Sequence, residues 1–405
     1  MRVSARAQRV QPFYVMEMAK TAGAIAREAA GTDRPMIYLN IGEPDFTAPP
    51  LVQEAAERAI REGRTQYTQA TGLPALRERI SAWYAERFQV DVPARRIVVT
   101  AGASAALQLA CLALIEAGDE ILMPDPSYPC NRQFVSMAEG RAVMIPSTAA
   151  ERFQLSSGKV QEAWGARTRG VMLASPSNPT GTSIHPDELA RIHAAVQERG
   201  GLTLIDEIYL GLSYDDTYGH SALRLGEDVI SINSFSKYFN MTGWRLGWLV
   251  VPEALVEVIE QIAQHLFICA STVSQCAALA CFEPASLAEY ERRRAEFKAR
   301  RDWFVPQLNA LGLPVPVTPD GAFYAWADCR AACDKLFAAR SEYNSEMQTP
   351  GSWEFAFELM KRAHLAVTPG RDFGHADTAA FVRFSTANSM AQLHTAVERL
   401  KTVLA

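Results

Sequence analysis

The feature that most constrains the fold of this chain is an alternation of short apolar runs with amphipathic stretches between residues 96 and 251. The apolar runs, which predict buried strands, lie at residues 97–100, 121–123, 143–145, 170–174, 202–205, 229–232 and 248–251. Apolar residues at helical spacing follow several of them, as at 186–199. Strands that alternate with helices pair in a mostly parallel sheet with helices on both faces. The sequence therefore predicts an α/β fold.

Length and composition limit the class of protein. A chain of 405 residues is too long for one simple core, so we expect one large and one smaller domain. The net charge of -5 gives no basic footprint for nucleic acid. No window approaches a membrane span, and the first residues lack the apolar core of a signal peptide. This absence predicts a cytoplasmic protein. The seven cysteines lack metal-binding spacing, which predicts no metal site, and most lie in apolar helical stretches, which predicts reduced thiols.

The segments outside the alternating region predict further elements. Helical spacing appears at residues 13–29, 51–61, 253–265 and 271–283, and near 352–363 and 389–403. Apolar runs that predict additional short strands lie at 37–41, 323–326 and 381–384. The heavily charged run 289–301 is interpreted as a solvated helix face that links the two domains. Residues 339–351, which are polar and contain proline and glycine, predict a flexible loop.

Residues 232–247 contain the pattern with the clearest chemistry. Ser234, Ser236 and Lys237 follow a buried strand, and Arg245 comes eight residues after the lysine. Two hydroxyl donors and a planar guanidinium suit a phosphate monoester, which arginine binds bidentately. A lysine beside them is a candidate Schiff-base former, because burial and neighbouring charge make its amine less basic than in water. The segment therefore predicts a phosphate site with a reactive amine.

Other candidate residues lie at or near strands. Gly102, Ala103 and Ser104 stand between a strand and a helix, where free amides and the helix dipole attract an anion. Asp206 ends an apolar strand and needs a partner, since an unpaired buried charge is costly. Arg383 lies within an apolar strand, where its partner is either an internal acidic residue or an anionic ligand.

Four further residues fit ordinary structural roles as well as functional ones. Gly42 and Asn178 stand in turn-like segments. Tyr67 and Tyr128 fit half-buried or loop aromatics that pack on their neighbours. Each of these residues stands in a motif of several residues, and the motif indicates a function more specifically than the single residue does.

These motifs together resemble the class I/II pyridoxal phosphate (PLP)-dependent aminotransferases of the aspartate aminotransferase-like superfamily. The matching strings are Asn-Ile-Gly-Glu-Pro-Asp-Phe from residue 40, Tyr-x-x-x-x-Gly from 67, Ser-Asn-Pro-Thr-Gly from 177, the lysine segment 232–247, and Val-Arg-Phe-Ser from 382. The resemblance covers residues from about 37 to 386, with the motifs in family order. It implies PLP fold type I, with a mostly parallel seven-stranded sheet flanked by helices and a smaller α+β domain.

The resemblance implies a role for each candidate residue. Lys237 would hold PLP as a Schiff base and move the substrate's Cα proton, and Asp206 would keep the pyridine nitrogen protonated. Tyr209 would donate to the phenolic oxygen of the cofactor. The remaining cofactor contacts would come from Ala103, Ser104, Tyr128, Asn178, Ser234, Ser236, Arg245 and, across a homodimer interface, Tyr67 of the partner subunit. The substrate carboxylate would bind at Gly42, Asn178 and Arg383.

The resemblance also implies the domain division and leaves alternative functions. The large domain would cover residues 51–288, and the small domain would combine 1–50 with 289–405. β-Lyases and cyclopropane-forming synthases use the same fold and residues, and their reactions diverge only after the Cα proton has left. Transcription regulators with an aminotransferase-like domain need a DNA-binding helix-turn-helix module, and we expect none in the fewer than forty residues before Asn40.

The expected reaction transfers the amino group of an L-amino acid to a 2-oxo acid by ping-pong chemistry. We expect a neutral donor, such as alanine or a branched-chain or aromatic amino acid. In one aspartate-using branch of the family, a lysine in the turn matching residues 101–106 binds the distal carboxylate, and Ser104 stands in its place here. Burying that carboxylate unpaired costs several kcal/mol. Arg27 and Arg371 remain as alternative sources of a cation.

Overall fold

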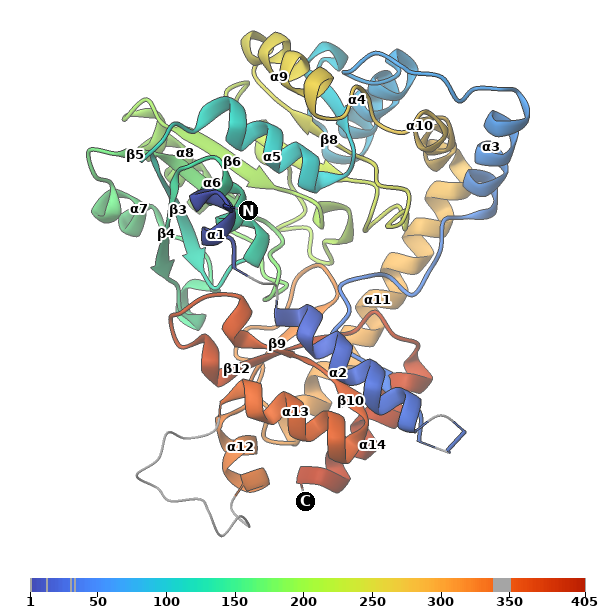
Figure 1. Cartoon of the computed structure of the whole chain (residues 1–405), viewed down its shortest axis with the longest axis vertical. Coiled ribbons are helices and arrows are strands. Elements are labelled where there is room, and N and C mark those ends of the chain that lie inside the picture. Colours follow the sequence, from blue (N-terminus) through green and yellow to red (C-terminus); the bar gives the residue numbers. More distant parts are fainter. Residues whose placement is uncertain (1, 12–13, 30, 33, 338–350, 405) are drawn as a thin grey trace.

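The computed structural model describes residues 2–11, 14–29, 31–32, 34–337 and 351–404. Figure 1 shows an upper part that contains the central sheet and a lower part that contains both α2 (Tyr14–Glu28) and α14 (Met390–Leu404). The long helix α11 (Pro284–Ala310) runs from one part to the other. The predicted loop at 339–351 lies, except for Gly351, outside the described residues.

In the described part of the chain, seven strands form the central sheet and confirm the α/β fold. Their order is β2 (Ile97–Thr100), β8 (Gly247–Val250), β7 (Ile230–Ser234), β6 (Leu202–Asp206), β5 (Thr168–Ala174), β3 (Glu120–Asp125) and β4 (Arg141–Pro146). Strands β3 to β7 pair in parallel, whereas β8 is antiparallel to both β2 and β7. Each strand overlaps the apolar run that predicts it.

The reversed direction of β8 follows from the connection before it. Residues 235–246 contain turns instead of the helix that usually joins parallel neighbours. Asn240 and Arg245 in this connection have φ angles of 53° and 52°, which do not fit a right-handed helix. The chain therefore folds back on itself, and Ser234 pairs with Gly247. This return brings the arginine of the lysine segment beside its serines.

Helices cover both faces of the sheet. The helices of the upper part are α3 (Pro50–Arg61), α4 (Pro74–Phe88), α5 (Ala103–Leu114), α6 (Pro129–Met137), α7 (Ser157–Ala163), α8 (Pro186–Gln197), α9 (Glu253–Leu266) and α10 (Thr272–Leu279), with α1 (Ala5–Arg9) against α6. No helix within the described ranges is long and apolar enough to cross a membrane.

Alternate residues of each strand enter different hydrophobic cores, because strand side chains point to opposite faces. Val98 and Leu249 pack in the core that contains α5 and α9. Val99 and Trp248, one residue away on the same strands, pack in the core that contains α4. There the indole of Trp248 donates a hydrogen bond to the hydroxyl of Tyr84 at 3.1 Å. Burial on both faces explains why the strands are continuous apolar runs.

The lower part has its own hydrophobic core. Its strands are β9 (Tyr324–Asp328), β11 (Thr368–Pro369) and β12 (Phe381–Ser385), which are antiparallel, and β1 (Ile37–Tyr38), which is parallel to β10 (Leu365–Ala366). Helices α12 (Arg330–Phe337) and α13 (Ser352–Ala363) pack with α2 and α14. This core combines residues 18–39 with residues 304–404. The separate cores support the division at 51–288, which stays a prediction.

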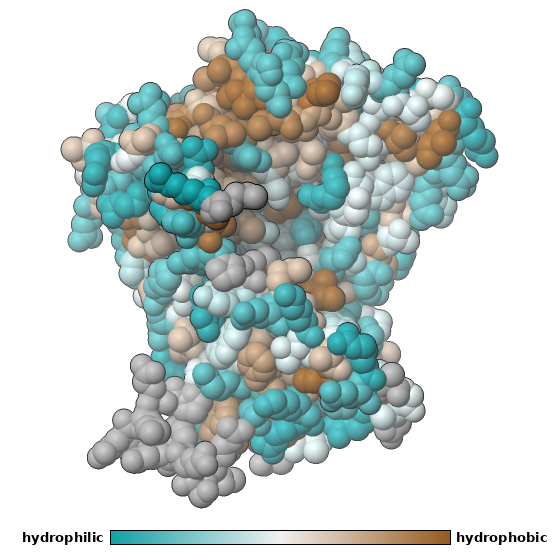
Figure 2. Space-filling model, viewed as in Figure 1, coloured by the Kyte–Doolittle hydropathy of each residue, from teal (hydrophilic) through white to brown (hydrophobic). Residues whose placement is uncertain are grey.

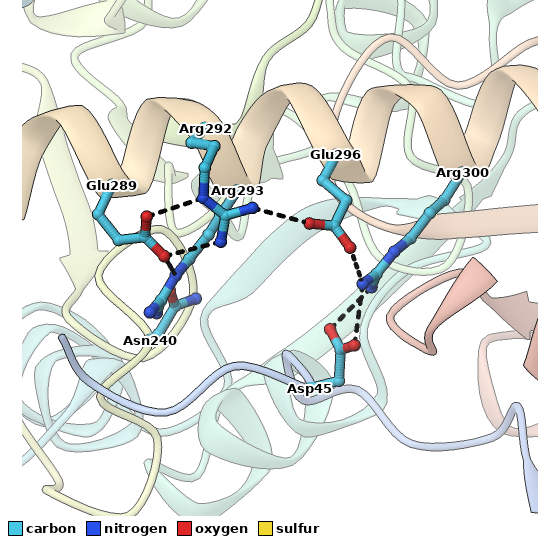
Figure 3. Close-up of polar contacts among 7 residues, drawn as sticks. All are labelled: Asp45, Asn240, Glu289, Arg292, Arg293, Glu296 and Arg300. Carbon is cyan, nitrogen blue, oxygen red and sulfur yellow. Dashed lines mark hydrogen bonds and ion pairs between the residues drawn. The ribbon is translucent and has the colours of Figure 1, made fainter. Parts of the chain in front are cut away.

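The interpretation of run 289–301 as a solvated face is wrong for part of α11. Arg293 and Arg300 are 8% and 1% exposed. Figure 3 shows them directed at Asn240 and Asp45, which lie in loops distant in the sequence. The terminal nitrogens of both arginines find acceptors, which offsets the cost of burial, although Nε of Arg300 has no partner. Because the acceptors are distant in the sequence, the local charge pattern does not reveal them.

The close pairing of β5 and β6 predicts a strong effect at Gly170. A Cβ there would collide with the carbonyl oxygen of Leu202 and lie 2.9 Å from its nitrogen. Gly170→Ala should therefore lower the unfolding free energy by about 1–3 kcal/mol, as overpacking does. The control is Gly158→Ala in α7, where no atom lies within 4 Å of the added Cβ. Thermal unfolding midpoints measure both, and an equal midpoint for the two variants would contradict the prediction.

Candidate active site

A cavity of about 420 Å³ lies at the carboxyl ends of β5, β6 and β7, facing residues of the lower part. In Figure 2 this face of the molecule is hollowed between the two parts. The lining includes all the predicted site residues except Tyr67: Gly42, Ala103, Ser104, Tyr128, Asn178, Asp206, Tyr209, Ser234, Ser236, Lys237, Arg245 and Arg383. Parallel strands bring their carboxyl ends to one edge of a sheet, where ligands of α/β proteins bind.

One end of the cavity has the donors of an anion site. The hydroxyl of Ser234 donates to that of Ser236 at 2.9 Å, and the Arg245 guanidinium lies beside Gly102. A Cβ on Gly102 would lie only 2.6 Å from that guanidinium, and its φ of 85° favours glycine. Ala103 follows as the first residue of α5, so free amides and the helix dipole face the same point. The two hydroxyls, the guanidinium and the N-terminus of α5 therefore converge on one point, where an anion can bind.

Lys237 lies in the connection after β7, and its amine reaches the segment that follows β1. Its Nζ donates to the carbonyl oxygen of Gly42 at 2.5 Å. Burial and then the positive charge of Arg383 lower the pKa of Lys237 to about 8. A lysine with that pKa has a substantial neutral fraction near physiological pH, as a nucleophile or a general base requires.

Asp206 ends β6 at the floor of the cavity and is 6% exposed. Burial raises the pKa of Asp206 to about 6, against the opposing effects of a hydrogen bond from the amide of Ile208 at 3.0 Å and the charge of Lys237. A carboxylate in this position gains from a cationic ligand atom, because the ligand charge offsets the desolvation of the carboxylate.

Tyr324 of β9 is a site residue that the sequence motifs do not reveal. Its hydroxyl and that of Tyr209 are hydrogen-bonded at 2.7 Å. Its ring lies 4.4 Å from the Arg383 guanidinium carbon, and a Cβ on Gly42 would be 2.7 Å from its hydroxyl. Only the predicted strand at 323–326 marks this residue in the sequence, and a strand pattern does not say which site its side chains enter.

Arg383 on β12 is 4% exposed, and its partners are neutral oxygens. It donates to Oδ1 of Asn178 at 2.7 Å, to the carbonyl of Asn40 at 2.8 Å and to the hydroxyl of Thr368 at 3.2 Å. Among the described residues it forms no ion pair with a carboxylate, and its Nε has no hydrogen-bond partner. Of the two explanations for an arginine in an apolar strand, the geometry favours an anionic ligand.

Tyr67 does not line the cavity of its own chain, and it is 78% exposed to solvent. This exposure leaves the Tyr67 side chain accessible to a partner subunit. The prediction that Tyr67 acts across a subunit interface stays a prediction.

Nearly the whole chain is similar to known proteins. Residues 34–400 match the model of the family described as aminotransferase class I and II. The chain belongs to this family. It is similar to valine–pyruvate aminotransferase of Mycobacterium tuberculosis, with 35% identity over 98% of this chain and 97% of that protein. It is 32% identical to an aspartate aminotransferase of Rhizobium meliloti, over 97% of this chain and 95% of that protein.

The fold agrees with that assignment. The crystal structure of an aminotransferase from Mycobacterium tuberculosis superposes with a TM-score of 0.90 and 34% identity, covering 100% of this chain and 99% of that one. The chain is therefore an aminotransferase of a PLP-dependent family. The cavity suits the cofactor, because the converging donors match its phosphate, the weakly basic Lys237 its aldehyde, and the buried Asp206 its pyridinium.

The lowered pKa of Lys237 predicts how the apoenzyme captures PLP. Only the neutral amine reacts, so the capture rate should rise with pH and level off above about 8. An exposed lysine, with a pKa of about 10.4, would keep rising to higher pH. Stopped-flow absorbance measures the rate, and parallel reactions with Nα-acetyllysine correct for ionisation of PLP itself. A corrected rate that still climbs beyond about pH 9.5 would show that the site does not depress this pKa.

Proposed function

We propose that this aminotransferase uses PLP linked to Lys237 to move the amino group of a neutral L-amino acid to a 2-oxo acid in a ping-pong reaction. The observation that supports this best is the meeting of Lys237, Asp206 and Arg383 in one cavity beside the anion site. A reactive amine, a buried carboxylate and an arginine without a carboxylate partner together match the cofactor and the carboxylate of an amino acid.

Bound PLP supplies an electron sink for the bond that breaks at the substrate's Cα. Lys237 accepts the proton from Cα and returns it elsewhere as general base and acid, for which a pKa of about 8 is suited. The negative charge of Asp206 stabilises the protonated form of the cofactor's ring nitrogen. Tyr209, fixed by its hydrogen bond to Tyr324, donates to the phenolic oxygen.

The remaining residues bind and orient. Ser234, Ser236, Arg245 and the amides of Ala103 and Ser104 hold the phosphate, while Tyr128 covers the ring. Arg383 binds the substrate's α-carboxylate, and Asn178, which accepts a hydrogen bond from that arginine, aligns it together with Gly42. Orientation of this kind lowers the barrier because the reacting groups are already placed.

The proposed neutral substrate rests on the charges that line the cavity. Within the described residues, its cations are Lys237, Arg245 and Arg383, each with a proposed role elsewhere. Arg371 instead stacks on Tyr14, with its guanidinium carbon 4.1 Å from the ring centre.

Much of the rest of the lining is apolar, with Met16, Leu107 and Ile208 as examples. The named relatives include enzymes for valine and for aspartate, so the proposed choice depends on these residues.

We also propose a cytoplasmic homodimer in which each subunit supplies Tyr67 to its partner's phosphate. The exposure of Tyr67 supports the interface, and the absence of disulfides among the seven cysteines, all of which are described, supports a reducing compartment.

The role of Lys237 is tested by Lys237→Ala. The wild-type protein should bind PLP covalently, with a visible absorbance band that borohydride bleaches, and the reduced adduct should map to Lys237. The variant should lose oxo-acid-dependent amino transfer by at least about 1,000-fold, as removal of a covalent catalyst does. Assays without an oxo acid, which detect pyruvate and ammonia, serve as the control for β-elimination. Full transfer by the variant would sink the assignment.

The choice of donor is tested with leucine and aspartate, whose side chains have the same branching but differ in charge. Leucine should convert the cofactor to its amine form with kcat/KM at least about 100-fold higher than aspartate, because the described residues that line the cavity include no further cation. Single-turnover absorbance follows each half-reaction, with alanine, valine and phenylalanine completing the panel. If aspartate has the highest kcat/KM of the panel, the proposed substrate class is wrong.

A further inference from the structure

Two of the three buried arginines on helix α11, Arg293 and Arg300, bind two different loops (Figure 3). Arg300 holds both carboxylate oxygens of Asp45, with nitrogen–oxygen distances of 2.8 and 3.0 Å. Arg293 donates to Oδ1 of Asn240 at 2.8 Å. It also donates to the carbonyl oxygen of Thr47 at 2.6 Å. The helix thus binds the segment near residue 45 at two points. At a third point it binds the connection 235–246, which is called the lysine loop below.

Phe46 adds an apolar contact between these polar ones. Its ring centre lies 4.9 Å from the guanidinium carbon of Arg293 and 5.1 Å from that of Arg300. The ring of Phe297, on the same helix, packs edge-on against it at 5.4 Å. Arg292 also lies over this ring, at 5.9 Å, so three cations and a carboxylate with both oxygens bonded leave the segment little freedom to shift along the helix.

Both loops end at the candidate active site. Asn240 donates from Nδ2 to the backbone carbonyl of Lys237 at 2.9 Å. At the end of the other loop, the carbonyl of Gly42 accepts from the Lys237 amine at 2.5 Å, and that of Asn40 accepts from Arg383 at 2.8 Å. The helix is therefore connected to the amine through one loop and to the substrate-binding groups through the other.

We propose that Arg293 and Arg300 are positioning residues that set Lys237 against the substrate-binding segment 40–42. Neither arginine lines the cavity, so each acts through the loop that it binds. The inference rests on the proposed function, since it matters only when Lys237 reacts with a substrate held by that segment. Both arginines lie on one continuous helix, about two turns apart, so α11 links the two loops in a way that neither loop does alone.

The geometry requires arginine and not only positive charge. Arg300 uses two nitrogens of one planar group for Asp45, and a lysine ammonium cannot reproduce this fork. Arg293 likewise serves Asn240 and the carbonyl of Thr47 with one nitrogen while its Nε binds Glu289. Replacement by lysine therefore keeps the charge on α11 and removes only the geometry.

The test compares Arg293→Lys and Arg300→Lys with Lys298→Ala, all in the full-length, PLP-loaded protein. Lys298 lies on the same helix and forms an ion pair with Asp302 in which both side chains are 46% exposed, so its removal measures what loss of an exposed ion pair on α11 does to activity. Steady-state kinetics with leucine and pyruvate, an acceptor without a distal carboxylate, give kcat and KM per PLP-loaded site. Thermal unfolding and the rate of PLP capture by apoenzyme are measured alongside.

Both arginine variants should lose about 100-fold in kcat/KM, the scale expected when reacting groups move by about 1 Å. In Arg300→Lys the loss should appear mainly as a higher KM, because the substrate-binding segment shifts. In Arg293→Lys it should appear mainly in kcat, and apoenzyme should capture PLP about tenfold more slowly, because the lysine loop shifts. Lys298→Ala should match the wild type in every measurement.

A change of less than about threefold in kcat/KM per loaded site overturns the inference for that arginine, even where the unfolding temperature falls. If Arg300→Lys does not fold, Asp45→Asn takes its place, because it removes the charge at nearly constant shape. If Arg293→Lys does not fold, Asn240→Gly replaces it in the test, because glycine tolerates the φ of 53° at this position.

Failure of the proposed function looks different from failure of this inference. In the first case, the wild-type protein itself shows no borohydride-sensitive PLP adduct and no transfer. In the second, the wild type is active and the two arginine variants are as active as Lys298→Ala.

Discussion

The hydrogen bond from the Lys237 amine to the Gly42 carbonyl is the contact on which the arrangement of the site depends. The lysine belongs to a connection in the central sheet, whereas Gly42 follows a strand of the second core. Neither part contains a complete site, so the chemistry exists only where the two cores pack together. Helix α11 passes between them, and its buried Arg293 and Arg300 determine how closely the two loops meet.

The same packing sets the electrostatics of the cavity. Three cations, Lys237, Arg245 and Arg383, share it with Asp206, a carboxylate that burial makes less acidic. Burial and positive charge together make the lysine amine less basic, and the same charges attract phosphate and carboxylate groups. A reactive amine and an anion-binding pocket therefore have one physical origin. The choice of substrate side chain depends on the few residues that line the remaining wall of the cavity.

The contacts of Arg383 show how a structure can decide between explanations that a sequence leaves open. An arginine in an apolar strand satisfies either an internal acid or a ligand, and its neighbours here are the neutral oxygens of Asn178, Asn40 and Thr368. For the charged run on α11, the sequence indicates an explanation that the structure contradicts. Its pattern indicates a solvated helix, yet Arg300 is buried because Asp45, 255 residues earlier, supplies the matching acceptor.

The sequence by itself determined the α/β class, the strands of the sheet and many of the polar residues that line the cavity, because hydrophobic periodicity and short motifs are local properties. The direction of β8, the pairing of Tyr324 with Tyr209 and the burial of Arg293 were decided only in the tertiary structure. Each of these depends on which distant segment lies opposite. That choice is made by the packing of whole elements, since a strand or a charged helix face has the same local pattern whatever its partner is.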